Sequence, residues 1–226
     1  MARASSDGII LLCMANRWST GVDTAGAILE RAIDHLSERG PVGVHPNVIC
    51  DELAISRALV NYYFGGRDGL IGEAMVVAYE RYVDLLWDAA ERAGDKPLER
   101  LTAWIDRQVE WTRENAGLAA ALNFPYQSFT AQVALADDLT QRLTAAGSRN
   151  FDNLQALVRA AAEDARGTSP PDPVRDALDA AAIGWLTLGM SVWNAGRHLP
   201  TQEVDRGLFP IASEHVHKLI VELLAR

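Results

Sequence analysis

The sequence has few of the features that mark secreted, metal-binding or membrane-spanning proteins. It contains two cysteines in 226 residues, and Cys13 and Cys50 lack the CxxC spacing of a zinc or redox site. The apolar run from Ile9 to Ala15 is too short to cross a bilayer, which takes about 20 residues. It also lacks the small-residue cleavage site of a signal peptide. We therefore expect no disulfide framework and no membrane partner, and interpret residues 1–22 as a flexible arm, or as an over-long gene start ahead of Met14.

Recognisable signatures of catalysis are also absent. The sequence has no nucleophile elbow, no P-loop and no dinucleotide-binding fingerprint. A helical di-iron enzyme needs two E-x-x-H pairs with further glutamates, and this chain has one such pair, from Glu214 to His217. His215 and His217 are two residues apart and would diverge on a helix. The sequence thus predicts a protein that is not an enzyme and has no cofactor and no metal site.

Positive charge is scarce, above all in the N-terminal third. The formal net charge is −9. Residues 1–71 hold six arginines and no lysine against eight acidic residues, a net charge of −2. Such a balance argues against broad nonspecific binding to nucleic acid. Any binding to DNA would depend on a few well-placed cations, and its salt dependence should be moderate.

The abundant residues favour a helical fold. Hydrophobic residues make up 49% of the chain, which is ample for a packed core. Alanine, leucine, glutamate and arginine are plentiful, and all are good helix formers. Apolar residues recur at helical spacing between glycine and proline breaks. We predict about nine helices, at residues 24–39, from His45 to the turn at Ala54, and at 57–63, 67–93, 97–115, 117–123, 127–166, 173–197 and 208–225.

Residues Val48 to Leu70 form the most specific pattern in the chain. A short helix with one apolar face is followed by a tight turn at Ala54-Ile55-Ser56. A second short helix then ends at Phe64, before Gly65-Gly66. Two short helices joined by such a turn are the helix-turn-helix unit, whose second helix fits the DNA major groove. The pattern therefore predicts a protein that reads DNA.

This segment resembles the TetR family of bacterial transcriptional regulators over about residues 24–71. The resemblance rests on the run from Ile49 to Ser56, a small residue at Ala58, an apolar one at Val60, an aromatic pair before Phe64 and a basic residue at Arg67. The chain departs from the family at Ala54, where glycine is frequent, and at Asn61, where tyrosine is usual. The resemblance implies a dimeric repressor, released from DNA by a ligand, with an all-helical C-terminal sensor domain.

The predicted fold is all-α, with two domains behind the N-terminal arm. Residues 23–71 are expected to form a three-helix DNA-binding domain, and residues 72–226 a helical domain for ligand sensing and dimerisation. The helix over 67–93 would leave the first domain and join the second, and it is the only candidate through which a ligand could move the DNA reader. A DNA reader of this kind is expected in the cytoplasm.

Side chains off the buried face of the second short helix are the candidate DNA contacts. Ile55, Val60 and Phe64 should face inward. Arg57 could donate two hydrogen bonds to the edge of a guanine, and Asn61 could form hydrogen bonds with adenine or a phosphate. The candidate DNA-binding residues are His45, Asn47, Arg57, Ala58, Leu59, Asn61, Tyr62, Tyr63 and Arg67. The resemblance implies that Tyr63 and Arg67 clamp the DNA backbone; the alternative is that the tyrosines are interdomain core and the arginines are solvated charges.

Aromatic residues of the C-terminal part suggest a small-molecule pocket. Trp104 and Trp111 are seven residues apart, on one face of a predicted helix, with Gln108 between them on the same side. An aromatic wall with a few amides and hydroxyls suits an amphipathic ligand. The candidate ligand-binding residues are Trp104, Gln108, Trp111, Asn123, Phe124, Tyr126, Phe129 and Trp185. The alternative is that these aromatics only fill a helical core.

Two C-terminal helices are candidates for a dimer interface. The helix at 173–197 carries small residues that allow another helix to come close, and the helix at about 208–225 is apolar on one side. We therefore predict a homodimeric, ligand-responsive regulator, most readily a repressor, of a palindromic operator in double-stranded DNA. The alternative function is a helical small-molecule-binding protein that does not bind DNA.

Overall fold

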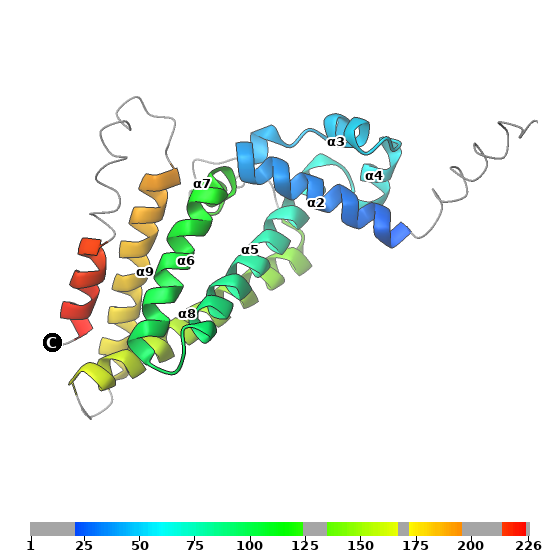
Figure 1. The fold of residues 1–226 in the computed structure, drawn as a ribbon. Helices are drawn as coiled ribbons and strands as arrows, with labels where there is room; N and C mark the ends of the chain where they lie inside the picture. The colour runs from blue at the N-terminus through cyan, green and yellow to red at the C-terminus, as the bar shows by residue number, and fades with distance from the viewer. Residues whose placement is uncertain (1–20, 124–134, 167–171, 196–213, 225–226) are drawn as a thin grey trace, which may run out of the picture.

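The computed structural model describes residues 21–123, 135–166, 172–195 and 214–224. Within these ranges every regular element is a helix and no strand occurs, as predicted (Figure 1). The elements in chain order are α2 (Gly21–Arg39), the 3-10 turn η1 (Pro41–Gly43), α3 (Pro46–Glu52), α4 (Ala58–Phe64), α5 (Arg67–Arg92), α6 (Pro97–Glu114), α7 (Ala116–Asn123), α8 (Asp137–Arg166) and α9 (Pro173–Ala195). Residues 214–224 are also helical.

The helix ends follow local backbone chemistry. Both α2 and α4 are followed by a glycine with positive φ: Gly40 has φ +68° and ψ −172°, and Gly65 is left-handed helical with φ +69° and ψ +11°. Glycine takes this conformation without the penalty that a Cβ brings. Proline opens α3 at Pro46, where its missing N–H costs no helical hydrogen bond. These residues explain why the bounds of the short helices were predictable.

Two predicted helices begin elsewhere than expected. The first predicted helix starts at Gly21, three residues before position 24. The helix predicted from residue 127 starts at Asp137, because residues 135 and 136 are not helical. Residues 127–134 and 208–213 lie outside the described part of the chain. None of the helices in the described ranges is long and apolar enough to span a membrane.

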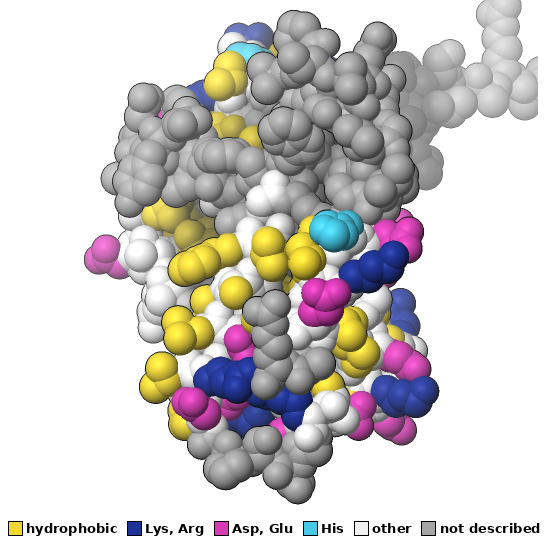
Figure 2. All heavy atoms as spheres, turned by 90° about the vertical axis from the view of Figure 1, so that its left-hand side faces the viewer, with side chains coloured by type: hydrophobic (Ala, Val, Ile, Leu, Met, Phe, Trp, Pro, Cys, Tyr) yellow, Lys and Arg dark blue, Asp and Glu magenta, His cyan; other side chains and the backbone are white. Residues whose placement is uncertain are grey.

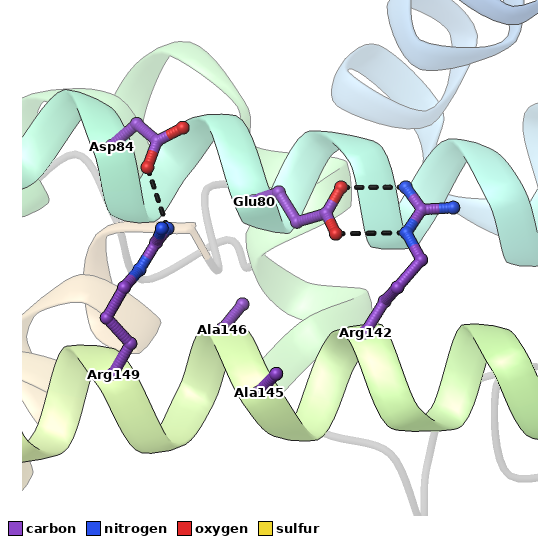
Figure 3. Close-up of a pocket in the computed structure, with 6 residues that line it drawn as sticks. All are labelled: Glu80, Asp84, Arg142, Ala145, Ala146 and Arg149. Atoms are coloured by element: carbon purple, nitrogen blue, oxygen red, sulfur yellow. Dashed lines mark hydrogen bonds and ion pairs between the residues drawn. The ribbon is translucent and has the colours of Figure 1, made fainter.

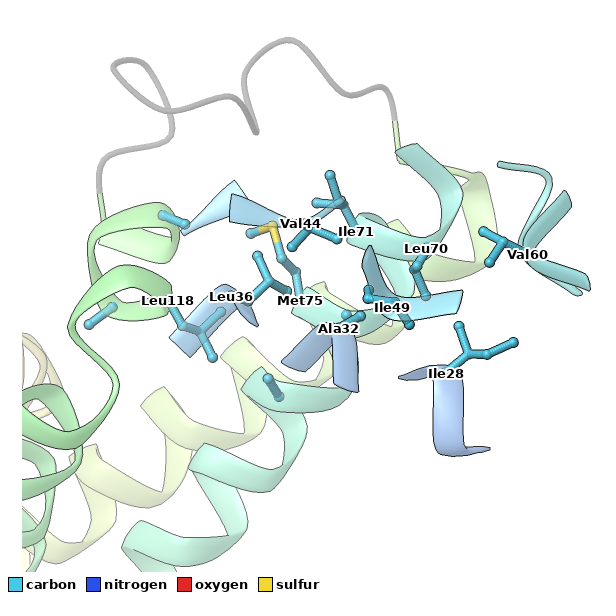
Figure 4. Close-up of a cluster of buried hydrophobic side chains, with 14 of the residues drawn as sticks. Ile28, Ala32, Leu36, Val44, Ile49, Val60, Leu70, Ile71, Met75 and Leu118 are labelled. Carbon is cyan, nitrogen blue, oxygen red and sulfur yellow. The ribbon is translucent and has the colours of Figure 1, made fainter. Parts of the chain in front are cut away.

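The short helices lie at one end of the molecule, and α5 runs away from them alongside the longer helices (Figure 1). One cluster of buried side chains holds this end together (Figure 4). It joins α2, α3 and α4 to the first half of α5 through residues such as Ile28, Ile49, Val60 and Leu70. A second cluster joins the other half of α5 to α6, α8, α9 and residues 214–224. The chain thus has two cores, with α5 in both.

The first cluster extends beyond the predicted DNA-binding domain. It includes Trp111 of α6 and Leu118, Ala119 and Ala121 of α7. Figure 4 shows Leu118 beside Leu36 of α2. The helix α5 was predicted to be the only element through which a ligand could move the DNA reader; α7 also packs on α2, so it is a second connection between the two parts.

Candidate nucleic-acid interface

The turn between α3 and α4 has the geometry of a helix-turn-helix. Ala54 takes a left-handed conformation with φ +52°, and the N–H of Ile55 donates to the carbonyl of Cys50 at 3.0 Å. The hydroxyl of Ser56 accepts a hydrogen bond from the N–H of Ala58 at 3.3 Å, which fixes the start of α4. The left-handed turn explains why glycine is common at the Ala54 position of the family that the sequence resembles.

Cys50 packs beneath this turn. It is a free, buried cysteine, and burial raises the pKa of its thiol. A thiol with a raised pKa is poorly reactive at neutral pH. Cys50 therefore contributes packing to the interface, as a small apolar residue would.

The inner face of α4 is broader than predicted. Val60 is buried, and Ile55 and Phe64 pack half-buried against the first cluster, as expected. Leu59 and Tyr63 were predicted to point outward or to the rim, but both are half-buried against the same cluster. The helix α4 has seven residues, or about two turns. More than half of them therefore face the first cluster, namely Leu59, Val60, Tyr63 and Phe64.

Four of the predicted contacts are exposed, one at the N-cap of α4 and three on its outer face. Arg57, Ala58, Asn61 and Tyr62 are exposed, and Tyr62 is 79% exposed. His45 and Asn47, at the start of α3, are exposed as well. The Arg57 guanidinium lies 3.9 Å from the carboxylate of Asp51, and both side chains are mostly in solvent. Such a pair is weak, so Arg57 can turn to another acceptor.

Arg67 occupies a different environment from the one predicted. It was expected at the DNA backbone, but its Nε donates to the carbonyl of Val44 at 2.9 Å and its Nη2 to that of Pro41 at 2.8 Å. The side chain is 31% exposed. With Tyr63 half-buried and Arg67 bonded inside the domain, the candidate contacts His45, Arg57, Tyr63 and Arg67 do not form one outward positive face.

The predicted ligand-binding residues separate into different surroundings. Trp104 is 2% exposed in the second cluster, Trp111 is 8% exposed in the first, and Gln108 is buried between them. Trp185 is 73% exposed, unlike Trp104 and Trp111. Asn123 ends α7, whereas Phe124, Tyr126 and Phe129 lie outside the described residues.

The indole N–H of Trp104 is in an unusual environment. Its indole Nε1 is buried and has no hydrogen-bond partner among the described residues. The indole of Trp87 lies beside it, with ring centroids 6.3 Å apart. An unpaired buried N–H costs free energy, and a hydrogen-bond acceptor placed there would remove that cost. No group of three or more potential metal ligands occurs in the part of the chain that the structure describes.

A polar cavity of about 370 Å³ lies between α5 and α8 (Figure 3). Its floor is Ala145 and Ala146. Arg142 donates to both carboxylate oxygens of Glu80, at 2.7 and 3.0 Å, and to Glu73 at 2.7 Å. Arg149 donates to Asp84 at 2.7 Å. Sequence reasoning missed this cavity, although Glu73 and Glu80, like Arg142 and Arg149, are seven residues apart and so share a helix face.

These ion pairs connect α5 to α8 through charge. The bonds from Arg142 lower the pKa of Glu80, and they raise the pKa of Arg142 itself. On its other side α5 is joined to α2, where Arg81 pairs with Glu30. The cavity is therefore lined by charged groups that already have partners, unlike the aromatic pocket predicted from the sequence.

An apolar surface lies on α9 and the C-terminal helix. Its exposed large side chains are Val174, Leu178, Trp185 and Leu186 on α9, and Leu219 and Val221 on residues 214–224. Figure 2 shows hydrophobic side chains gathered on this side of the molecule. Exposed apolar patches of this kind mark surfaces that bind other proteins.

Comparisons with known proteins agree on the fold. No protein-family model and no curated protein matches the sequence. Among solved structures, the TetR-family regulator PfmR from Thermus thermophilus matches with a TM-score of 0.59 and 21% identity, covering 86% of this chain and 97% of PfmR. The fatty acid degradation regulator FadR from Bacillus halodurans matches with a TM-score of 0.60 and 13% identity, covering 87% of this chain and 97% of that regulator.

A third match, FadR from Bacillus subtilis, was solved in complex with stearoyl-CoA. It has a TM-score of 0.59 and 12% identity, and the match covers 86% of this chain and 96% of FadR. Identities this low show likeness of fold. Together with the helix-turn-helix geometry, they establish that the chain has the fold of the TetR-family transcriptional regulators.

Proposed function

We propose that this protein is a TetR-family transcriptional regulator, acting as a repressor that binds a palindromic operator as a homodimer and leaves it when a small molecule binds. The observation that carries the proposal is the outer face of α4. It is exposed and polar, it follows a left-handed turn at Ala54, and it belongs to a chain with the fold of DNA-binding regulators.

The exposed residues of α4 have the chemistry to read bases. Arg57 can donate two hydrogen bonds to guanine, and Asn61 can pair with adenine. Ala58 can contact a thymine methyl, and the hydroxyl of Tyr62 can reach a phosphate. His45 and Asn47 would contact the backbone from the start of α3. Leu59 and Tyr63 would support these contacts from the half-buried side of α4.

The apolar surface on α9 and residues 214–224 supports the proposed dimer. Leu178 and Trp185 are 64% and 73% exposed, which is costly for side chains of this size. A two-fold axis through this surface would bury it against its own copy in a four-helix arrangement. The two α4 helices would then meet half-sites about one helical turn, roughly 34 Å, apart.

The proposed effector is an apolar or amphipathic small molecule that binds in the C-terminal domain. Trp104 and Gln108 support this proposal, because they place an unpaired indole N–H and a buried amide among apolar helices. The effector would need a hydrogen-bond acceptor to satisfy Trp104. Its binding would have to favour the DNA-free form, since only differential affinity shifts an equilibrium.

Two observations favour the alternative, a small-molecule-binding protein without DNA affinity. Arg67 is bonded inside the domain, and Asp51 and Glu52 place negative charge beside the helix-turn-helix. The two functions differ in one measurement. Purified protein should be used to select the duplexes that it binds from a random-sequence DNA pool at low salt. Footprinting on the region upstream of its own gene should follow. An enriched palindrome with a matching footprint supports the regulator; no enrichment and a featureless footprint would support the alternative.

A further inference from the structure

Arg67 is the first residue of α5, and it binds the segment that leads into α3. Its Nε and Nη2 donate to the carbonyls of Val44 and Pro41 at 2.9 and 2.8 Å. Val44 and Pro41 are buried, and carbonyls in such places need donors. The planar guanidinium supplies two N–H groups from one rigid plane, which suits two carbonyls close together.

The segment held in this way directly precedes two proposed DNA contacts. Val44 is followed by His45, and Asn47 comes two residues later; both side chains are exposed. Apart from Arg67, the segment is held by the burial of Val44 in the first cluster and by two hydrogen bonds of η1, from the N–H of Gly43 to Gly40 at 3.0 Å and from the N–H of Val44 to Pro41 at 3.3 Å. The guanidinium therefore joins the start of α5, next to the end of α4, to the start of α3.

We propose that Arg67 is a positioning residue for DNA binding, acting through the Pro41–Val44 segment on His45 and Asn47. The proposal rests on the proposed function, and it replaces the direct phosphate contact that the sequence resemblance implied for Arg67. Loss of the two hydrogen bonds would let the segment shift, and the contacts from α3 would lose their alignment with those from α4.

The two roles of Arg67 predict different behaviour of a lysine variant. A phosphate contact needs positive charge, which Arg67→Lys preserves. Bridging two carbonyls needs the guanidinium fork, which lysine lacks. We expect Arg67→Lys to weaken binding to the selected duplex almost as much as Arg67→Ala, by about tenfold or more, while Arg92→Ala at the exposed far end of α5 changes it less than about twofold.

A double-mutant cycle with His45→Ala tests the path of the effect. If Arg67 acts through His45, then adding Arg67→Lys to His45→Ala should cost much less than Arg67→Lys costs alone. The salt dependence should also be decisive. Loss of a direct phosphate contact lowers the slope of log Kd against log salt by about 0.9. Arg67→Ala should therefore lower the slope by that amount if Arg67 contacts a phosphate, and should leave it nearly unchanged if Arg67 only positions the segment.

Failure of the proposed function and failure of the positioning role give different results. If the wild type selects no duplex, the proposed function fails. If the wild type binds and Arg67→Lys keeps nearly full affinity, or if the two substitutions are additive, the positioning role is wrong. Should Arg67→Ala fail to fold, Arg67→Lys decides, with circular dichroism and urea unfolding confirming that the variant is folded in the binding assay.

Discussion

The rings of Tyr82 and Trp111 lie 4.3 Å apart between centroids, inclined by 39°. This contact joins α5 to α6, and Tyr82 packs against both buried clusters. Burial raises the pKa of the Tyr82 hydroxyl well above its usual range. The tryptophan that sequence reasoning placed at a ligand is thus part of the contact between the two cores.

Trp111→Ala should destabilise the protein. Trp111 is 8% exposed, and removal of a buried tryptophan costs about 3–5 kcal/mol. Urea unfolding at fixed protein concentration measures the loss, and Trp111→Phe, which keeps a ring against Tyr82, should lose less. An unfolding midpoint equal to that of the wild type would show that Trp111 does not stabilise the core, and Trp111 would again be a candidate ligand-binding residue.

Gly117→Ala should destabilise the contact between α7 and α2. A Cβ at Gly117 would lie 2.3 Å from the nitrogen of Gly40 and 2.6 Å from the carbonyl oxygen of Leu36. These are backbone atoms, so overpacking should cost about 1–3 kcal/mol. The matched control is Gly26→Ala, where no atom lies within 4 Å and a gain of about 0.5–1 kcal/mol is expected for a helix. Equal stability of the two variants would mean that α7 can withdraw from α2.

Ala54→Gly should stabilise the fold. The left-handed conformation costs an L-residue about 1–2 kcal/mol, and glycine removes this cost but adds about 0.5–1 kcal/mol of chain entropy on folding. The net gain should be about 0.5–1 kcal/mol, measured by urea unfolding. A loss of stability would show that Ala54 is unstrained in this turn.

The ion pairs of Arg142 should make stability sensitive to acid. Because the folded-state pKa of Glu80 is lowered, its contribution is complete above the ordinary value of 4.5 and is lost as the pH falls through the lowered pKa. Arg142→Met removes the partner but keeps an apolar stem. The wild type should therefore lose more free energy of unfolding than Arg142→Met between about pH 5 and about pH 3.

The exposed pair of Lys218 with Glu214 provides the control for that experiment. An exposed pair four residues apart on a helix contributes little, so Lys218→Met should follow the acid response of the wild type. An identical response of wild type and Arg142→Met would show that the pairs between α5 and α8 do not contribute to stability.

Leu178→Glu with Trp185→Glu should separate the proposed dimer. Like charges at the centre of an apolar interface oppose association, and light scattering should then give a mass near 24.6 kDa instead of twice that value. Phe151→Glu, on α8 at a 42% exposed position, is the control. A wild type that is already monomeric, or a double variant that stays dimeric, would contradict the assignment of this surface.

Much of the architecture followed from local chemistry. The bounds of α3 and α4 were predictable because Pro46, Gly65 and the turn at Ala54 act on the backbone within a few residues. The inward direction of Val60 was predictable for the same reason, since helical spacing sets which residues share a face. These features need no knowledge of distant contacts.

Tertiary structure decided which partners the remaining residues have. Leu59 and Tyr63 turned inward because α2 and α5 together present a wide apolar surface to a short helix, and Arg67 turned inward because Pro41 and Val44 bring two carbonyls to it. Trp104 and Trp111 share a face of α6, yet Trp104 packs in the cluster that contains α8 and α9, and Trp111 packs in the cluster that contains α2 and α7. Sequence by itself determined the helices, their breaks and the apolar faces, which depend on neighbours along the chain; only the packing of distant segments decided what each face covers.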